Sequence, residues 1–199
     1  MRKIYLVRHA QYSNPRNILV GRLPVELSQE GKQEASDLAD YFSDKEIFKI
    51  YSSSVLRCKQ TSEIISKNQI EIKYDTRILE TFSAMQGYWE FDWLHFFNNI
   101  DTLGGETPED ISKRMLDFWD DIISSENDKN IIICSHGDPL YVLYAHLADI
   151  ALPSIKGLYE IPKVDYQEKA SVRTIEIDNF GKLFIKPTLT INNIRELQK

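Results

Sequence analysis

Four short apolar runs, separated by segments with helical periodicity, constrain the fold of this chain more than any other feature. Each run has the length and composition of a strand buried on both faces, and together they comprise residues 3–7, 48–52, 70–74 and 131–134. Between the runs, apolar side chains recur at spacings of three and four, most clearly after Ser28 and after Thr107. Strands that alternate with helices predict a three-layer α/β/α sandwich around a mostly parallel central sheet.

The C-terminal part has a different pattern. Residues 171–177 and 182–186 flank the turn sequence Asn179-Phe180-Gly181, which predicts a β-hairpin and therefore an antiparallel edge on the sheet. No linker rich in Gly, Ser or Pro divides the 199 residues. Because domains commonly run to roughly 100–200 residues, we expect residues 1–199 to form a single domain.

The charge balance excludes some classes of partner. The chain has 24 Lys and Arg against 30 Asp and Glu, a net charge of −6, so it has no general attraction to nucleic acid or anionic membranes. We therefore expect a small-molecule partner, no nucleic acid, no membrane, and a monomer or homodimer. Cys58 and Cys134 lack the spacing of a disulfide scaffold or a zinc site. The apolar runs are too short for a signal peptide or a membrane span, which favours a cytoplasmic location.

Basic side chains follow three of the predicted strands. The first strand ends at Arg8-His9, the second leads to Arg57, and the fourth ends at Ser135-His136. Ligands bind at the carboxyl ends of parallel strands, so these groups are expected to meet at one edge. Guanidinium groups repel a metal ion, but they suit a phosphate dianion, and a neutral imidazole is a competent nucleophile. The sequence therefore predicts a phosphoryl-transfer site that uses no metal and no cofactor.

The segments that carry these residues resemble the histidine phosphatase (phosphoglycerate mutase-like) superfamily. Residues 6–10, LVRHA, are similar to the LVRHG signature, residues 53–61 to S-x-L-x-R-x-x-Q-T, and residues 135–137 to SHG. Further similar blocks are Gly21-Arg22 with Leu27-Ser28 and Gly31, then Leu79-Glu80, Gly87-Tyr88-Trp89-Glu90 and Gly104-Gly105-Glu106. The blocks occur in family order from residue 4 to about residue 140, and this order makes the resemblance specific.

The resemblance implies a role for each matching residue. His9 would be the nucleophile that forms a phosphohistidine, and Glu80 the general acid and base. The remaining residues expected to bind the substrate, mainly through its phosphoryl oxygens, are Arg8, Arg57, His136, the backbone NH of Gly137, Asn14, Gly21 and Arg22.

The chain departs from the family pattern around the acid. Six residues separate Glu80 from Gly87, where many members have almost none. Asp138 is therefore an alternative proton donor, although it is also placed to cap a helix beginning at Pro139. The two other histidines, His95 and His146, have no evident partner and are expected to be structural.

The segment between Ile78 and Ser112 contains no Lys or Arg but is rich in aromatic residues. These are Phe82, Tyr88, Trp89, Phe91, Trp93, Phe96 and Phe97, accompanied by the acids Glu90, Asp92 and Asp101. We expect residues 81–106 to form an aromatic lid, which would repel a second phosphate and favour a phosphatase over a mutase. The same aromatics would equally suit a lid core or a partner interface. A phosphoglycerate mutase, a phosphoprotein phosphatase and an inactive binding protein remain alternatives.

Overall fold

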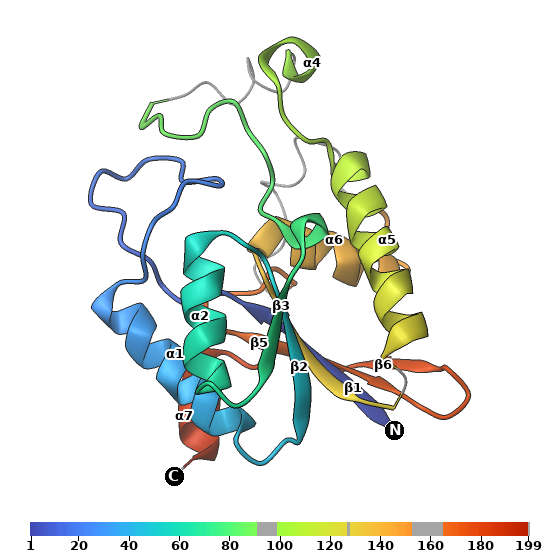
Figure 1. Ribbon diagram of the computed structural model, residues 1–199. Helices are drawn as coiled ribbons and strands as arrows, with labels where there is room; N and C mark the ends of the chain where they lie inside the picture. Colours follow the sequence, from blue (N-terminus) through green and yellow to red (C-terminus); the bar gives the residue numbers. More distant parts are fainter. Residues whose placement is uncertain (91–98, 127, 153–164, 199) are drawn as a thin grey trace.

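A six-stranded mixed sheet forms the centre of the protein, for which a computed structural model describes residues 1–90, 99–126, 128–152 and 165–198 (Figure 1). The strands are β1 (Arg2–Arg8), β2 (Ile47–Ser52), β3 (Glu71–Tyr74), β4 (Asn130–Ser135), β5 (Val172–Ile177) and β6 (Leu183–Ile185). Their order is β3-β2-β4-β1-β5-β6. The first four pair in parallel, whereas β5 runs antiparallel to both β1 and β6. The mostly parallel sheet and its antiparallel edge are therefore confirmed.

Helices cover both faces of the sheet. On one face lie α1 (Gln29–Phe42), α2 (Leu56–Ser66) and α7 (Ile191–Leu197), and on the other lie α5 (Pro108–Ser125) and α6 (Gly137–Leu147) (Figure 1). Side chains alternate along β1. Tyr5 and Val7 pack in the core between the sheet and α1, α2 and α7, whereas Ile4 and Leu6 pack in the core between the sheet and α5 and α6. This arrangement is the predicted three-layer sandwich.

The helix boundaries follow from capping residues. Ser28 Oγ accepts from the NH of Gly31 at the start of α1, and Thr107 forms a capping box with Asp110 at the start of α5. The start of α6 differs from the prediction, because His136 occupies the N-cap position and the helix begins at Gly137. Asp138 is therefore not the cap of this helix, and the capping interpretation is wrong.

Two long segments extend beyond the carboxyl ends of the parallel strands (Figure 1). One connects β1 to α1, and the other connects the short helix η1 (Thr76–Ile78) to α5 through α4 (Ile100–Leu103). The second segment is closed at its base, where an antiparallel bridge joins Ser83 to Gly105. The NH of Ala84 donates to the carbonyl of Gly104 at 3.0 Å, and that of Glu106 to the carbonyl of Phe82 at 3.0 Å. Of the helices described, none is both long and apolar enough to cross a membrane.

Candidate active site

The predicted His and Arg residues meet at the carboxyl edge of the sheet. Strands β1 and β4 are neighbours in which Arg8 is level with Ser135, so His9 and His136 emerge side by side. Their ring centroids are 5.1 Å apart. Arg57 joins them from the first turn of α2, which follows β2 on the other side of β4. Sheet topology alone therefore places three residues that are remote in the sequence within one cluster.

His9 is held as a neutral imidazole. Its Nδ1 lies 2.9 Å from the carbonyl oxygen of Ala10, which can only accept, so Nδ1 carries the proton and Nε2 keeps its lone pair. Arg57 Nε donates to Nε2 at 3.0 Å. Burial and the nearby charges of Arg57 and Arg8 hold the pKa of His9 well below its ordinary value. An unprotonated Nε2 can attack a phosphoryl group once the Arg57 Nε–H that it accepts turns to a phosphoryl oxygen instead.

Arg57 is the centre of the cluster. Its side chain is 2% exposed, and its Nη2 lies 2.9 Å from the carbonyl oxygen of Gly21, 3.0 Å from Glu80 Oε2 and 2.9 Å from His136 Nδ1. Arg57 Nη1 and Arg8 Nε are buried without a hydrogen-bond partner among the described residues. Buried donors without an acceptor are costly, and a bound anion would satisfy them. The two guanidinium groups therefore form a receptor for an oxyanion.

His136 is fully buried and is oriented from both sides of its ring. Because Arg57 can only donate, Nδ1 accepts, and Nε2 donates to Ser53 Oγ at 2.8 Å. Burial, Arg57 and His9 hold the pKa of His136 well below its ordinary value. Ser53, which the sequence motif contains but to which no role was attached, fixes the tautomer of this histidine.

Glu80 lies at the edge of the cluster, just after η1. Its carboxylate accepts from Arg57 Nη2 and from the backbone NH of Thr81, both at 3.0 Å. Burial, and to a smaller extent Asp138, raise the pKa of Glu80, and Arg57 opposes this shift. A carboxyl group with a raised pKa is suited to carry a proton and then release it.

A cavity of about 190 Å³ opens next to Glu80. Its lining comprises Tyr12, Leu19, Val20, Gly21, Arg57, Glu80, Thr81, Ser83, Asp138 and Tyr166. Asp138 accepts from Thr81 Oγ1 at 3.0 Å and from Tyr166 Oη at 2.7 Å, so neutral hydroxyl groups bind it, whereas Glu80 contacts Arg57. Both candidate acids therefore line the same cavity, and Glu80 lies closer to the phosphoryl-binding guanidinium.

The remaining predicted residues are placed differently. Gly21 has a φ of +49°, and this turn directs its carbonyl oxygen to Arg57. Gly137 begins α6, and the free backbone NH groups at a helix N-terminus are suited to bind an anion. The amide of Asn14 bonds to both backbone groups of Ile18, and Asn14 does not line the cavity. Arg22 does not line it either and instead bonds to the carbonyl of Glu80 and to Glu106.

The predicted aromatic lid is only partly described. Tyr88 and Trp89 are 57% and 71% exposed and line a separate surface depression with Gly87 and Glu90. Phe82 instead packs against Arg22, whose guanidinium carbon lies 5.5 Å from the centroid of the Phe82 ring. Phe91, Asp92, Trp93, His95, Phe96 and Phe97 lie outside the described residues. His146 is exposed near the end of α6, away from the catalytic cluster.

A metal ion does not suit this cluster. His9, Glu80 and His136 offer ligand atoms within 4.8 Å of one another. Arg57, however, donates to all three of these side chains. A cation at this point would meet the guanidinium charge directly, so the donor set favours an anion.

One part of the site was missed by motif comparison. The backbone carbonyl oxygen of Gln167 accepts from Arg8 Nη1 at 2.7 Å, and the centroid of the Tyr166 ring lies 5.0 Å from the Arg8 guanidinium carbon. Lys169 is close enough to contribute to the lowered pKa of His9. The predicted hairpin could have indicated these residues. Its first strand, β5, runs antiparallel to β1 and begins beside the end of β1, so the residues just before β5 lie at the site.

Comparison with known proteins agrees with this geometry. A sequence profile of the histidine phosphatase superfamily (branch 1) matches residues 4–184. Phosphoserine phosphatase 1 of Hydrogenobacter thermophilus is 28% identical over 76% of this chain and 79% of its own. Phosphoglycerate mutase 1 of Saccharomyces cerevisiae is 26% identical over 79% and 83%. The solved structure of YhfR from Bacillus stearothermophilus superposes with a TM-score of 0.80 at 24% identity, covering 94% of this chain and 96% of that one.

Proposed function

Because the chain belongs to the histidine phosphatase superfamily (branch 1), we propose that it hydrolyses the phosphate monoester of a small molecule through a phosphohistidine intermediate, acting as a single domain. The observation that carries this proposal is the state of His9. An unprotonated Nε2 contacts Arg57, and two buried guanidinium nitrogens near it have no acceptor among the described residues. The group that would complete this arrangement is a phosphoryl group with its negative oxygens.

In the first step, His9 Nε2 attacks phosphorus while the bond from phosphorus to the leaving oxygen breaks. Arg8 and Arg57 hold the phosphoryl oxygens and stabilise the charge that develops on them. His136, which was also expected to bind these oxygens, donates its one N–H to Ser53 and accepts from Arg57 at Nδ1, so it acts by orienting the Arg57 guanidinium. Glu80 gives its proton to the leaving oxygen, for which its raised pKa suits it. The products of this step are an alcohol and a phosphohistidine.

In the second step, Glu80 is ionised and takes a proton from water. The oxygen of that water attacks phosphorus, and the bond between phosphorus and His9 Nε2 breaks. Orthophosphate leaves, and Glu80 is protonated again for the next turnover. The same carboxyl group thus acts as acid and then as base.

The charges near the cavity favour a phosphatase over a mutase, which is also represented among the relatives. A mutase must retain a doubly phosphorylated intermediate, which requires cations beyond the catalytic cluster. Between Ile78 and Ser112 there is no Lys or Arg. Arg22 and Arg114, which bond to residues of this segment, are both paired with Glu106. We therefore expect the protein to hydrolyse 3-phosphoglycerate at least as fast as it converts this compound to 2-phosphoglycerate. Efficient conversion that depends on priming with bisphosphoglycerate would establish a mutase instead.

The test is to trap the intermediate. The protein is mixed with a phosphate ester labelled in its phosphoryl group and quenched within milliseconds. We expect label that is stable to base and labile to acid, located on His9, and absent from His9→Ala. His146→Ala is the matched control, because His146 is exposed near the end of α6, and it should retain the label. Label on a serine or an aspartate would refute the proposed mechanism.

A further inference from the structure

The backbone that carries Glu80 is held at three points. Arg22 Nε donates to the carbonyl oxygen of Glu80 at 2.7 Å. Arg114 Nη1 donates to the carbonyl of Arg77 at 2.6 Å, and the NH of Phe82 donates to Glu106 Oε2 at 2.9 Å. The chain is therefore anchored before, at and after the residue that bears the acid.

One carboxylate connects these three anchors. Glu106 Oε2 accepts from Arg22 Nη2 at 2.8 Å and from Arg114 Nη2 at 3.0 Å, while Oε1 accepts from Arg114 Nε at 2.8 Å. The pairing with Arg114 is bidentate, which is the strongest and most directional form of this interaction. All three side chains are less than one-third exposed, so solvent screens the pairs only in part.

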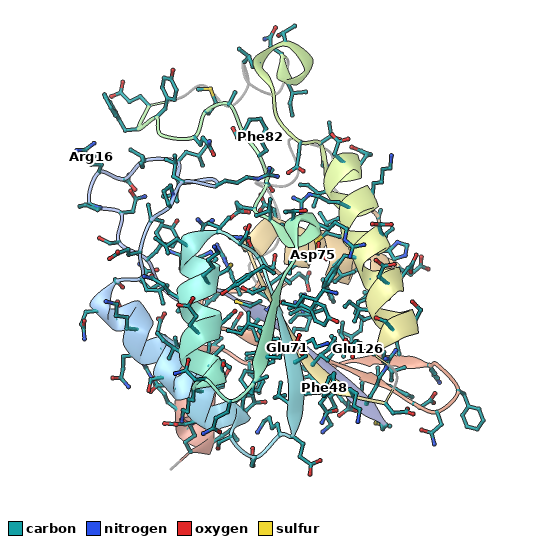
Figure 2. All side chains as sticks on the ribbon, in the orientation of Figure 1. Arg16, Phe48, Glu71, Asp75, Phe82 and Glu126 are labelled. Carbon is teal, nitrogen blue, oxygen red and sulfur yellow. The ribbon has the colours of Figure 1, made fainter. Side chains whose placement is uncertain are left out.

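The three charged residues come from separate parts of the chain. Arg22 lies on the segment between β1 and α1, Glu106 at the closed base of the second long segment, and Arg114 on α5. Figure 2 shows Phe82, which stacks on Arg22, above the sheet, with Arg16 at the outer end of the first long segment. Residues from both long segments and from α5 thus meet at the backbone of the acid.

We infer that Glu106 is a positioning residue for the proton transfers of Glu80, acting through Arg22 and Arg114, an inference that rests on the proposed function. None of the three lines the cavity. The phosphoryl-binding residues Arg8 and Arg57 bond to other partners, namely Gln167, Gly21, His9, His136 and Glu80 itself. Disturbing Glu106 should therefore impair acid catalysis and leave phosphoryl binding intact.

Leaving-group dependence separates these two effects. An alkoxide needs its proton as the bond breaks, whereas nitrophenolate leaves without help. Because Glu80 also serves as base in the second step, which both substrates share, the first step is read from kcat/KM. For Glu106→Gln we expect kcat/KM toward β-glycerol phosphate to fall about tenfold or more, a modest part of the 10²–10⁴ that general acid catalysis supplies. We expect kcat/KM toward p-nitrophenyl phosphate to change less than about twofold, and inhibition by orthovanadate to keep its potency, because phosphoryl binding is preserved.

Two matched controls accompany this variant. Glu109→Gln makes the same substitution on an exposed residue in the first turn of α5, and it should leave the rate of hydrolysis of both substrates unchanged. Arg22→Gln removes the bond to the carbonyl of Glu80, and it should reproduce the selective loss, whereas Arg16→Gln on the exposed part of the same segment should not.

An equal loss on both substrates, or no loss on either, in Glu106→Gln and Arg22→Gln alike would overturn the inference. If the proposed function itself is wrong, the result differs, because no phosphohistidine is then trapped in the unmodified protein. If that intermediate is trapped and Glu80→Gln shows the selective loss but Glu106→Gln and Arg22→Gln do not, only the positioning role is wrong. Circular dichroism of each variant verifies that the fold is intact.

Discussion

Replacing Gly137 by alanine tests how closely the active site is packed. An added Cβ would lie 2.0 Å from Oη of Tyr166 and 2.4 Å from its Cζ, far inside contact distance. Tyr166 would have to move, and it would give up its 2.7 Å hydrogen bond to Asp138 and its contact with Arg8. Gly137 is thus required by the space that Tyr166 occupies.

The expected magnitude follows from these contacts. Overpacking a filled site costs roughly 1–3 kcal/mol, and a hydrogen bond to a charged group contributes roughly 1.5–3 kcal/mol. The two losses overlap, since moving the tyrosine relieves the clash by breaking the bond. Alanine recovers roughly 0.5–1 kcal/mol from its better helix propensity. Gly137→Ala should therefore lower the free energy of unfolding by about 0.5–2.5 kcal/mol.

Urea unfolding of a double-mutant cycle measures this effect. In the background of Tyr166→Ala the space is free, so Gly137→Ala should be neutral or slightly stabilising. In the background of Tyr166→Phe the ring still clashes but no hydrogen bond to Asp138 is lost, so a smaller loss should remain. Additive losses of Gly137→Ala and Tyr166→Ala would refute the reasoning, because they would show that the two side chains do not compete for the same space.

Three further predictions concern the chemistry. First, the pKa values of His9 and His136 lie well below the ordinary 6.5 in the folded protein, so the unfolded chain binds more protons. The free energy of unfolding should therefore fall as the pH drops below about 6.5. Urea titrations at pH 5 and pH 7 that give the same stability would contradict this. Second, Glu80→Gln should lower kcat/KM toward an alkyl phosphate far more than toward p-nitrophenyl phosphate, with a smaller and unselective loss for Asp138→Asn; the opposite ranking in steady-state kinetics would transfer the acid to Asp138. Third, turnover should survive EDTA, because imidazole and guanidinium groups perform the chemistry; loss of activity that Mg²⁺ restores would contradict a site without metal.

The sequence predicted the parts of the molecule that periodicity and strand order determine. The runs that form β1, β2 and β4 could be recognised because strands buried on both faces are continuous apolar segments in the sequence. The meeting of His9, Arg57 and His136 followed from one rule about the carboxyl ends of parallel strands. Each of these residues is within five positions of a strand end, so an error of one or two residues in a boundary did not matter.

Other features depended on contacts that no local pattern records. Arg22 was expected at the substrate, but its guanidinium reaches Glu106, which lies 84 residues away. The hydrogen bond of Tyr166 to Asp138 likewise joins residues 28 positions apart. The start of α6 was misplaced because Asp138 and Pro139 form a common helix-start sequence, whereas the strand continues directly into the helix through His136.

The bridge between Ser83 and Gly105 has a consequence for how this protein can diversify. It fixes the two ends of the intervening stretch, so the entropy of closing that loop is already spent and grows only slowly with length. Gln86 accepts from the NH of Arg22, and the backbones of Gly87 and Tyr88 bond to Leu19, which lines the cavity. Exchanges within the stretch that keep residues 84–88 should therefore leave the nucleophile and the oxyanion receptor undisturbed. The closed stem thus separates the reaction centre from a stretch whose sequence can be exchanged, and new substrate ranges can be engineered by grafting foreign sequence onto it.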